Sequence, residues 1–287
     1  MTAATDSARR PELAGRVAAI TGGGSGLGAA MAATFAAAGM AIAVLDIDEE
    51  RAASTAAALA ADHGVATTSL ATDVADAESV KAAAEHVRAA LGGCDLLCAN
   101  VGVQQFGAID RLTDADWQWV LGVNVMGTIH TVREFLPLLR ARSGWRHIAV
   151  TASSGVLIPG VRLGAYQTSK FAVLGFGETL RLELAAEGIG VSVLFPAGMT
   201  TRHLESSALA RPAALGASVT LPDDIDAMMA SRQVGEAHVA TAEHAVRNLL
   251  DDLLANEPYV LTHGDYRAKY HLRRDALEAA FDRMERA

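Results

Sequence analysis

The sequence predicts an α/β fold in which one doubly wound parallel sheet of seven strands carries helices on both faces. Short apolar runs rich in β-branched residues alternate with long alanine-rich segments along most of the 287 residues. Strands and helices that alternate in this order form a parallel sheet covered on both faces. Because the chain shows no internal repeat and no Pro- or Ser-rich linker, we expect a single domain.

The alternation predicts seven strands and five main helices. The strands are expected at residues 16–21, 41–46, 65–72, 95–100, 146–152, 190–195 and 259–262. The helices are expected at residues 26–38, 49–63, 77–91, 114–142 and 165–187. Alanine favours these helices because it has the highest helix propensity, and its small side chain lets a helix pack close to the sheet.

The composition excludes several classes of protein. Apolar residues make up 51% of the chain and charged residues only 20%, so the chain can bury a large core and is not disordered throughout. The net charge of -9 argues against binding to nucleic acid. Glycine or charged residues interrupt each apolar run before it reaches the length of a membrane span, and residues 1–11 lack the apolar core of a secretory signal. We therefore expect a soluble, cytoplasmic protein.

Cysteine and histidine residues give no strong metal or disulfide signal. Cys94 and Cys98 are too few for a disulfide framework, and we expect buried thiols, with a metal or redox pair as the alternative. The nine histidines form no tight His-x-x-x-His or His-Glu-x-x-His cluster, so we expect no metal site.

A glycine-rich turn, Thr-Gly-Gly-Gly-Ser-Gly-Leu-Gly at residues 21–28, follows the first strand directly and opens the first helix. Glycines at such a junction let the backbone approach a pyrophosphate, and the helix N-terminus stabilises its negative charge. The spacing of Gly22, Gly26 and Gly28 is Gly-x-x-x-Gly-x-Gly. This context predicts dinucleotide binding on a Rossmann-type sheet.

Asp46 ends the second strand, 18 residues beyond Gly28. A carboxylate at this position can accept hydrogen bonds from the adenosine ribose, and it would repel the 2′-phosphate of NADP. The expected cofactor is therefore NAD. The alternative is that Asp46 only caps the helix that begins near Glu49, which Asp48 could do equally well.

Tyr166 and Lys170 lie four residues apart near the start of the helix expected at residues 165–187. Residues with this spacing share one helix face, so the phenol and the ammonium can point into one cleft. A neighbouring positive charge favours the phenolate and lowers the pKa of a tyrosine from its usual value of about 10. Thirteen residues before Tyr166, Ser153 follows a strand end, where its hydroxyl could hold a substrate oxygen. The adjacent Ser154 is the alternative, and the 13-residue spacing favours Ser153.

Together, these motifs resemble the short-chain dehydrogenase/reductase family in its single-domain form, over residues 13–263. The resemblance implies that Asn124, in Asn-Val-Met-Gly, joins Ser153, Tyr166 and Lys170 in a catalytic tetrad. It also implies reversible hydride transfer between nicotinamide and a secondary alcohol or ketone. Tyr166 would exchange the hydroxyl proton as general acid or base, and Ser153 would position the substrate oxygen. Lys170 would hold the ribose hydroxyls, and Asn124 would anchor a water-mediated proton path.

The resemblance implies the remaining NAD contacts as well. Asp73-Val74 matches the family's Asp-Val, which contacts adenine, and Ala99-Asn100-Val101-Gly102 stands where the family has Asn-Asn-Ala-Gly. Pro196-Ala197-Gly198 matches the family's Pro-Gly, with Thr201 at the position that contacts the nicotinamide carboxamide. The expected cofactor-binding residues are Gly22, Ser25, Gly26, Leu27, Gly28, Asp46, Asp73, Val74, Asn100, Val101, Gly102, Tyr166, Lys170, Pro196, Gly198 and Thr201.

The positions expected to line a substrate pocket are mostly apolar and predict a moderately bulky hydrophobic substrate. They are Ser153, Val103, Gln104, Val156, Leu157, Leu163, Met199 and His203. Residues 197–237 mix helical patches with proline-containing turns, and a long segment of this kind is usually a lid or a mobile loop. Since ligands bind at the carboxyl ends of parallel strands, it would cover the site. The alternative is a variable surface insertion.

The two ends of the chain flank the expected domain at residues 13–263. Residues 1–12 form an N-terminal tail. Residues 264–287 form a C-terminal extension that looks like a mobile or partner-packed helix, whereas its acidic residues disfavour a membrane-surface helix. The family resemblance implies a dimer or tetramer with subunit contacts through the helices at 114–142 and 165–187.

Two rival functions stay open at this stage. One is a catalytically silent, NAD(P)-binding regulator, which would need no proton relay and is disfavoured by the complete tetrad. The other is an epimerase or dehydratase acting on a nucleotide sugar. The glycine spacing and the shortage of chain for a separate substrate domain argue against that class.

Overall fold

A seven-stranded, fully parallel sheet forms the centre of the molecule in the computed structural model, which describes residues 12–200, 203–216, 218–232 and 239–286. The strand order is β3-β2-β1-β4-β5-β6-β9. The strands are β1 (Val17–Thr21), β2 (Ala41–Asp46), β3 (Thr67–Ala71), β4 (Leu96–Ala99), β5 (His147–Thr151), β6 (Gly190–Phe195) and β9 (Tyr259–Leu261). The predicted doubly wound fold class is confirmed, and the observed strands lie within the predicted ranges.

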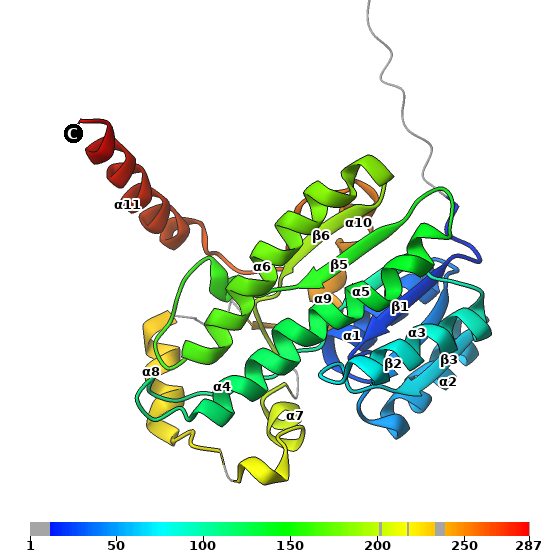
Figure 1. Ribbon diagram of the computed structural model, residues 1–287, viewed down its shortest axis with the longest axis horizontal. Coiled ribbons are helices and arrows are strands. Elements are labelled where there is room, and N and C mark those ends of the chain that lie inside the picture. The colour runs from blue at the N-terminus through cyan, green and yellow to red at the C-terminus, as the bar shows by residue number, and fades with distance from the viewer. Residues whose placement is uncertain (1–11, 201–202, 217, 233–238, 287) are drawn as a thin grey trace, which may run out of the picture.

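Helices cover both faces of this sheet (Figure 1). One face packs against α3 (Ala77–Leu91), α5 (Gly127–Arg140) and α6 (Gly164–Leu184). The other face packs against α1 (Gly26–Ala37), α2 (Glu49–His63), α9 (Ala242–Val246) and α10 (Leu249–Leu254). Successive strand residues point to opposite faces, so a strand buried on both sides must be apolar at every position.

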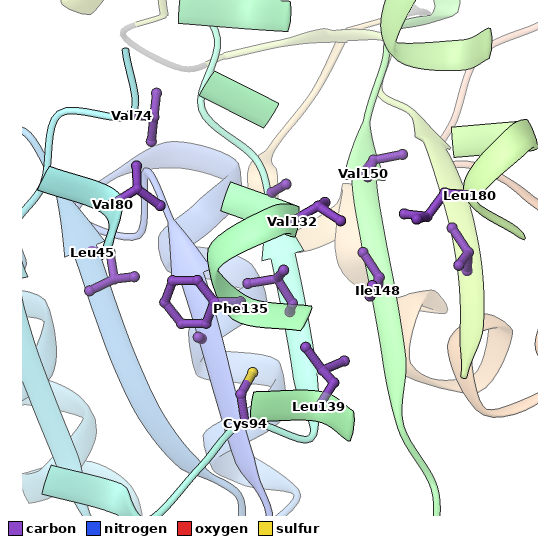
Figure 2. Packing of buried hydrophobic residues seen from close by; sticks show 14 of the residues in the cluster. Leu45, Val74, Val80, Cys94, Val132, Phe135, Leu139, Ile148, Val150 and Leu180 are labelled. Carbon is purple, nitrogen blue, oxygen red and sulfur yellow. The ribbon is translucent and has the colours of Figure 1, made fainter. Parts of the chain in front are cut away.

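Strand β1 shows this arrangement directly. Val17 and Ala19 belong to the core under α3, α5 and α6, whereas Ala18 and Ile20 belong to the core under α1 and α2. The first core is centred on α5, whose fully buried Phe135 packs among residues from several elements of that layer (Figure 2).

The helix predicted at residues 114–142 is interrupted in the structure. It consists of α4 (Asp114–Leu121), a π-helical segment (Gly122–Met126) and α5. Thr113 begins α4 with a capping box, in which its hydroxyl and the Asp116 carboxylate each accept a hydrogen bond from the other residue's backbone N–H. The π-helical turn carries Asn124, which is fully buried. π-helical turns of this kind often mark functional sites.

The segment expected as a lid contains more regular structure than the sequence indicates. It begins with β7 (Gly198–Met199), which pairs with β8 (Val239–Ala240), and continues into α7 (His203–Leu209) and α8 (Pro222–Arg232). The final helix, α11 (Arg267–Glu285), projects away from the rest of the chain (Figure 1). Across the described ranges, none of the helices combines the length and the apolar character needed to cross a membrane.

Candidate active site

A cavity of ≈ 1540 Å³ opens where the carboxyl ends of the central strands meet. It is lined by the loops after β1, β2, β3, β4, β5 and β6, together with side chains from α7 and α8. A pocket for one drug-sized ligand is usually smaller than about 1,000 Å³. This cavity therefore has room for a dinucleotide together with a small substrate.

The glycine turn at the start of α1 is shaped for an anionic ligand. Gly22 has a φ of +67°, in the left-handed region, and a Cβ on Gly28 would lie 2.0 Å from the Gly22 carbonyl oxygen. Ser25 is the N-cap of α1, but its side chain makes no capping hydrogen bond, and the first turn carries no acidic residue. Because the N-terminal N–H groups of a helix attract anions, this turn fits the diphosphate of a dinucleotide.

Asp46 borders the cavity at the end of β2. Its carboxylate accepts hydrogen bonds from the backbone N–H of Gly24 at 2.9 Å and of Asp48 at 3.1 Å. The N-cap of α2 is Asp48, which accepts from the Arg51 backbone N–H. The capping role considered for Asp46 therefore belongs to Asp48, and the Asp46 carboxylate stands at the cavity edge where a ribose would bind.

The other expected cofactor residues also gather around this cavity. Asn100 ties two strand ends together, since its Nδ2 donates to the Thr21 carbonyl and its Oδ1 accepts from the Thr151 hydroxyl. Thr201 lies outside the described residues. The remaining expected cofactor contacts that border the cavity are Ser25, Gly26, Leu27, Gly28, Asp73, Val74, Val101, Gly102, Pro196 and Gly198.

Tyr166 and Lys170 lie side by side on the first two turns of α6, and both border the cavity. The Lys170 ammonium is 5.8 Å from the centroid of the Tyr166 ring and donates a hydrogen bond of 2.8 Å to the Thr151 carbonyl at the end of β5. Lys170 is only 3% exposed, and this burial lowers the pKa of its ammonium to about 8. A Cβ on Gly102 would lie 3.0 Å from the ammonium, so glycine leaves room for it.

Ser153 and Asn124 form hydrogen bonds that order the backbone near Tyr166 and Lys170. The Ser153 hydroxyl borders the cavity and accepts a hydrogen bond from the Gly155 backbone N–H at 3.1 Å. The Asn124 side chain is not among the cavity-lining groups that the structure describes. It bonds to both backbone polar groups of Val103 at 2.8 and 3.0 Å, and donates to the Ser169 hydroxyl at 2.9 Å. Asn124 therefore fixes the loop after β4 against α6.

The substrate end of the cavity differs from the prediction in two residues. Val103, Gln104, Leu163, Met199 and His203 line it as expected. Val156 and Leu157 are not among its described lining residues. Val156 is buried in the core beneath α6, and Leu157 packs against the cluster of Ile158, Ala197 and Tyr266. The short 3₁₀ turn that follows Ser153 directs both side chains into the protein.

Three lining residues of this end were not predicted. Phe106 and Met228 form one buried cluster with Leu163 and Tyr166, and Trp119 of α4 borders the same space. Met228 lies 62 residues beyond Tyr166 in the sequence, and only the folding of α8 over the cavity brings them together. The neighbouring His203 stays neutral at physiological pH, because burial and then the positive charge of Lys170 lower its pKa to about 4.

Ion pairs, one of them buried, fasten the expected lid segment to the body. Arg211 lies 2.7 Å from the Asp116 carboxylate and also donates to the side chain of Gln105 at 3.0 Å. Although burial of Asp116 acts in the opposite direction, hydrogen bonds from Thr113 and Arg211 hold the pKa of its carboxyl below the usual range. Asp224 of α8 forms ion pairs with Arg111 and Arg162. The described parts of the segment are therefore held against the loops that frame Tyr166.

Comparison with known proteins agrees with this geometry. The family model of short chain dehydrogenases matches residues 16–211. The C alpha-dehydrogenase of Sphingobium sp. (strain NBRC 103272 / SYK-6) is 34% identical over 247 residues, which cover 85% of this chain and 80% of that protein. The probable oxidoreductase EphD of Mycobacterium tuberculosis (strain ATCC 25618 / H37Rv) is 35% identical over 78% of this chain, but the match spans only 38% of EphD.

A solved structure gives the same result. A short-chain dehydrogenase/reductase from Burkholderia phymatum, determined in complex with NAD, has a TM-score of 0.85 and 33% identity to this chain, covering 94% of this chain and 96% of that one. The protein therefore belongs to the short-chain dehydrogenase/reductase family, which confirms the resemblance seen in the sequence. It is an oxidoreductase of that family.

Burial of the Lys170 ammonium predicts a specific pH dependence of stability. Its pKa is about 8 in the folded protein against 10.5 ordinarily, so between these pH values the unfolded chain binds more protons. The contribution of this group to the free energy of unfolding therefore rises with pH, by about 3 kcal/mol in total. We therefore expect the unfolding free energy of Lys170→Met minus that of the wild type to fall by this amount as the pH rises from 7 to 10.5. Urea unfolding of both proteins without cofactor measures it, and a pH-independent difference would contradict the burial of a charged Lys170.

Proposed function

We propose that this protein is an NAD-dependent dehydrogenase that interconverts a secondary alcohol and its ketone. The observation that carries the proposal is the pairing of Tyr166 with the buried Lys170 ammonium at the cavity. A phenol beside a fixed positive charge can give up and take back a proton at moderate pH. The adjacent Ser153 hydroxyl is available to the same substrate oxygen.

The residues around the glycine turn fit NAD. The open N-terminus of α1 suits the diphosphate, and the Asp46 carboxylate suits the ribose hydroxyls while repelling a 2′-phosphate. When bound, NAD supplies the hydride acceptor of the reaction. The NAD complex of the Burkholderia phymatum relative, at 33% identity, supports the same cofactor here.

We assign each member of the tetrad the role that the family resemblance implies, and the contacts of each residue agree with it. Tyr166 accepts the proton of the alcohol during oxidation and returns it during reduction. Ser153 holds the substrate oxygen by hydrogen bonding. Of the three donors of the Lys170 ammonium, one is bonded to the Thr151 carbonyl, which leaves the ammonium fixed for ribose hydroxyls and for the phenol. Asn124 keeps the loop after β4 in place, and the family resemblance assigns it the anchoring of a water-mediated path for the proton.

The substrate is a neutral, moderately bulky hydrophobic alcohol or ketone. Phe106, Leu163 and Met228 pack around the Tyr166 ring, and Trp119 borders the same part of the cavity. His203 adds a neutral imidazole and no charge at pH 7. A pocket of this kind favours apolar surface around a single polar group. Helices α7 and α8, as parts of the lid at residues 197–237, cover this pocket.

The first test is replacement of the phenol. A panel of aliphatic and aromatic secondary alcohols with NAD, followed at the NADH absorbance band, should identify at least one substrate. For that substrate we expect Tyr166→Phe to lower kcat by 10²-fold or more, since general acid–base catalysis contributes about that much. The affinity for NAD, measured by fluorescence titration, should stay within roughly fivefold, since one exchanged net hydrogen bond is worth about 1 kcal/mol or less.

Tyr259→Phe is the matched control, because Tyr259 lies on β9 with its hydroxyl bonded to Glu178 and is not among the described cavity residues. It should keep wild-type turnover. Near-normal turnover by Tyr166→Phe, or a wild type inactive on the whole panel, would reject the proposed function.

The second test concerns the choice of cofactor. The wild type should use NAD far better than NADP because Asp46 repels the 2′-phosphate. Asp46→Ser should reduce this ratio of kcat/KM values about tenfold or more, which corresponds to about 1.4 kcal/mol of lost discrimination. Glu49→Gln removes an exposed carboxylate of α2 outside the described cavity lining and should leave the ratio unchanged. A wild type that prefers NADP would overturn the role given to Asp46.

A further inference from the structure

Within the described residues, helix α11 contacts the rest of the chain, here called the body, only near its N-terminal end, which we call its root. Beyond the root it projects away from the body like an arm (Figure 1). At the root, Tyr266 is buried against Ile158 and Ala197. Two turns into the helix, Arg273 donates a hydrogen bond to the Val156 carbonyl and lies 4.9 Å above the ring of Phe171. No residue of α11 itself is buried. The root has a defined position on the body, and the remainder of the helix is available for another contact.

An apolar stripe runs along this arm. Tyr270, Leu277 and Met284 follow one another at intervals of seven residues, with Phe281 between the last two, so all four share one helix face. Their exposed fractions lie between 42% and 65%. A seven-residue apolar repeat is the pattern of a helix that packs along another helix. A partner of similar shape would remove this stripe from water.

The charged side chains of α11 are distributed unfavourably with respect to the helix dipole. Residues 267–274 carry four basic and no acidic side chains, whereas residues 275–286 carry four acidic and two basic ones. Helix dipoles favour the opposite order, with acidic residues near the N-terminus and basic residues near the C-terminus. The arrangement weakens an isolated helix. It complements a second copy of the same helix that runs in the opposite direction.

We propose that α11 pairs antiparallel with α11 of a second copy of this chain, about a two-fold axis at Leu277. In this register Leu277 meets its own copy, and Tyr270 faces Met284 of the second copy. The two helix dipoles then point in opposite directions, which is a favourable arrangement. The basic half of each arm lies along the acidic half of the other.

The flanking charges agree with the same register. At 3.6 residues per turn, Arg267, Arg274, Glu278 and Glu285 all lie roughly 40° to 80° to one side of Tyr270. In an antiparallel pair, this flank of the first helix lies next to the equivalent flank of the second helix. Arg274 therefore meets Glu278 of the second copy, and Arg267 meets Glu285. Within one copy, Arg274 forms an exposed ion pair with Asp275 and also interacts electrostatically with Glu278, and exposed pairs of this kind contribute little and can be exchanged.

A parallel pair would place like charges together at both ends, whereas an antiparallel pair places the basic half of each helix beside the acidic half of the other. A helix pair of this length buries less surface than a standard protein interface. The association is therefore best detected by trapping the contact in the full-length protein.

Disulfide trapping tests the pairing directly. The chain has two cysteines, Cys94 and Cys98, both buried, and burial raises the pKa of both thiols and makes them unreactive. Leu277→Cys therefore introduces one reactive thiol on the proposed axis. With oxidised glutathione, we expect the full-length variant to form a disulfide-linked dimer on a non-reducing gel. Leu272→Cys, on the opposite side of α11 and 72% exposed, is the matched control and should form at least tenfold less.

Charge reversal tests the register. In the Leu277→Cys background, Arg274→Glu should lower the dimer yield severalfold, and adding Glu278→Arg should restore it. Equal cross-linking at positions 272 and 277, no cross-linking at 277, or no rescue by the double reversal would each overturn the proposal. If α11 instead binds membranes, Leu277→Cys will stay monomeric and sediment with phosphatidylglycerol vesicles, which also overturns it. None of these readouts depends on turnover, so failure here leaves the proposed function untouched.

Discussion

The site depends on one constraint, a positive charge that the fold holds out of water beside a phenol. The Lys170 ammonium is buried because α6 begins directly over the carboxyl end of β5, where the Thr151 carbonyl accepts its hydrogen bond. Burying a charge costs free energy unless the charge is well hydrogen-bonded, and this cost lowers the pKa of Lys170. Gly102 leaves the space that the ammonium occupies. Because the hydrogen bond to Thr151 fixes the ammonium, its positive charge stays close to Tyr166 on the same helix face.

The second requirement is that segments distant in the sequence close around this pair. Asn124 fixes the loop after β4, and the same loop carries Gln105, whose amide bonds to Arg211 of the lid segment. Arg211 in turn pairs with the buried Asp116 at the start of α4. Since breaking a buried ion pair leaves an uncompensated charge, these contacts set the position of the segment that carries Arg211. The shape of the apolar end of the cavity is thus fixed by polar contacts behind it, while its lining around Tyr166 stays apolar.

The sequence predicted the sheet and the placement of Tyr166 beside Lys170 well, because both depend on local patterns. Strand alternation, the glycine turn and the spacing between Tyr166 and Lys170 are visible in short stretches of chain. The π-helical turn at Asn124 was not predicted, since one added residue barely changes the apolar periodicity of a helix. Met228 was missed as a pocket residue, and Leu157 was wrongly expected there. Which side chain reaches a cavity depends on how α8 and the turn after Ser153 pack, and spacing alone does not carry that information.

The central claim is that the buried ammonium makes Tyr166 an effective base, and its most direct test is the pH dependence of kcat/KM for alcohol oxidation at saturating NAD. In the wild type, the rate should fall as the pH is lowered, because Tyr166 must lose its proton to accept one from the alcohol. In Lys170→Met, this fall should begin about one pH unit or more higher, since no positive charge favours the phenolate. If the fall occurs at the same pH in both proteins, the ammonium does not activate the phenol, and the account is contradicted.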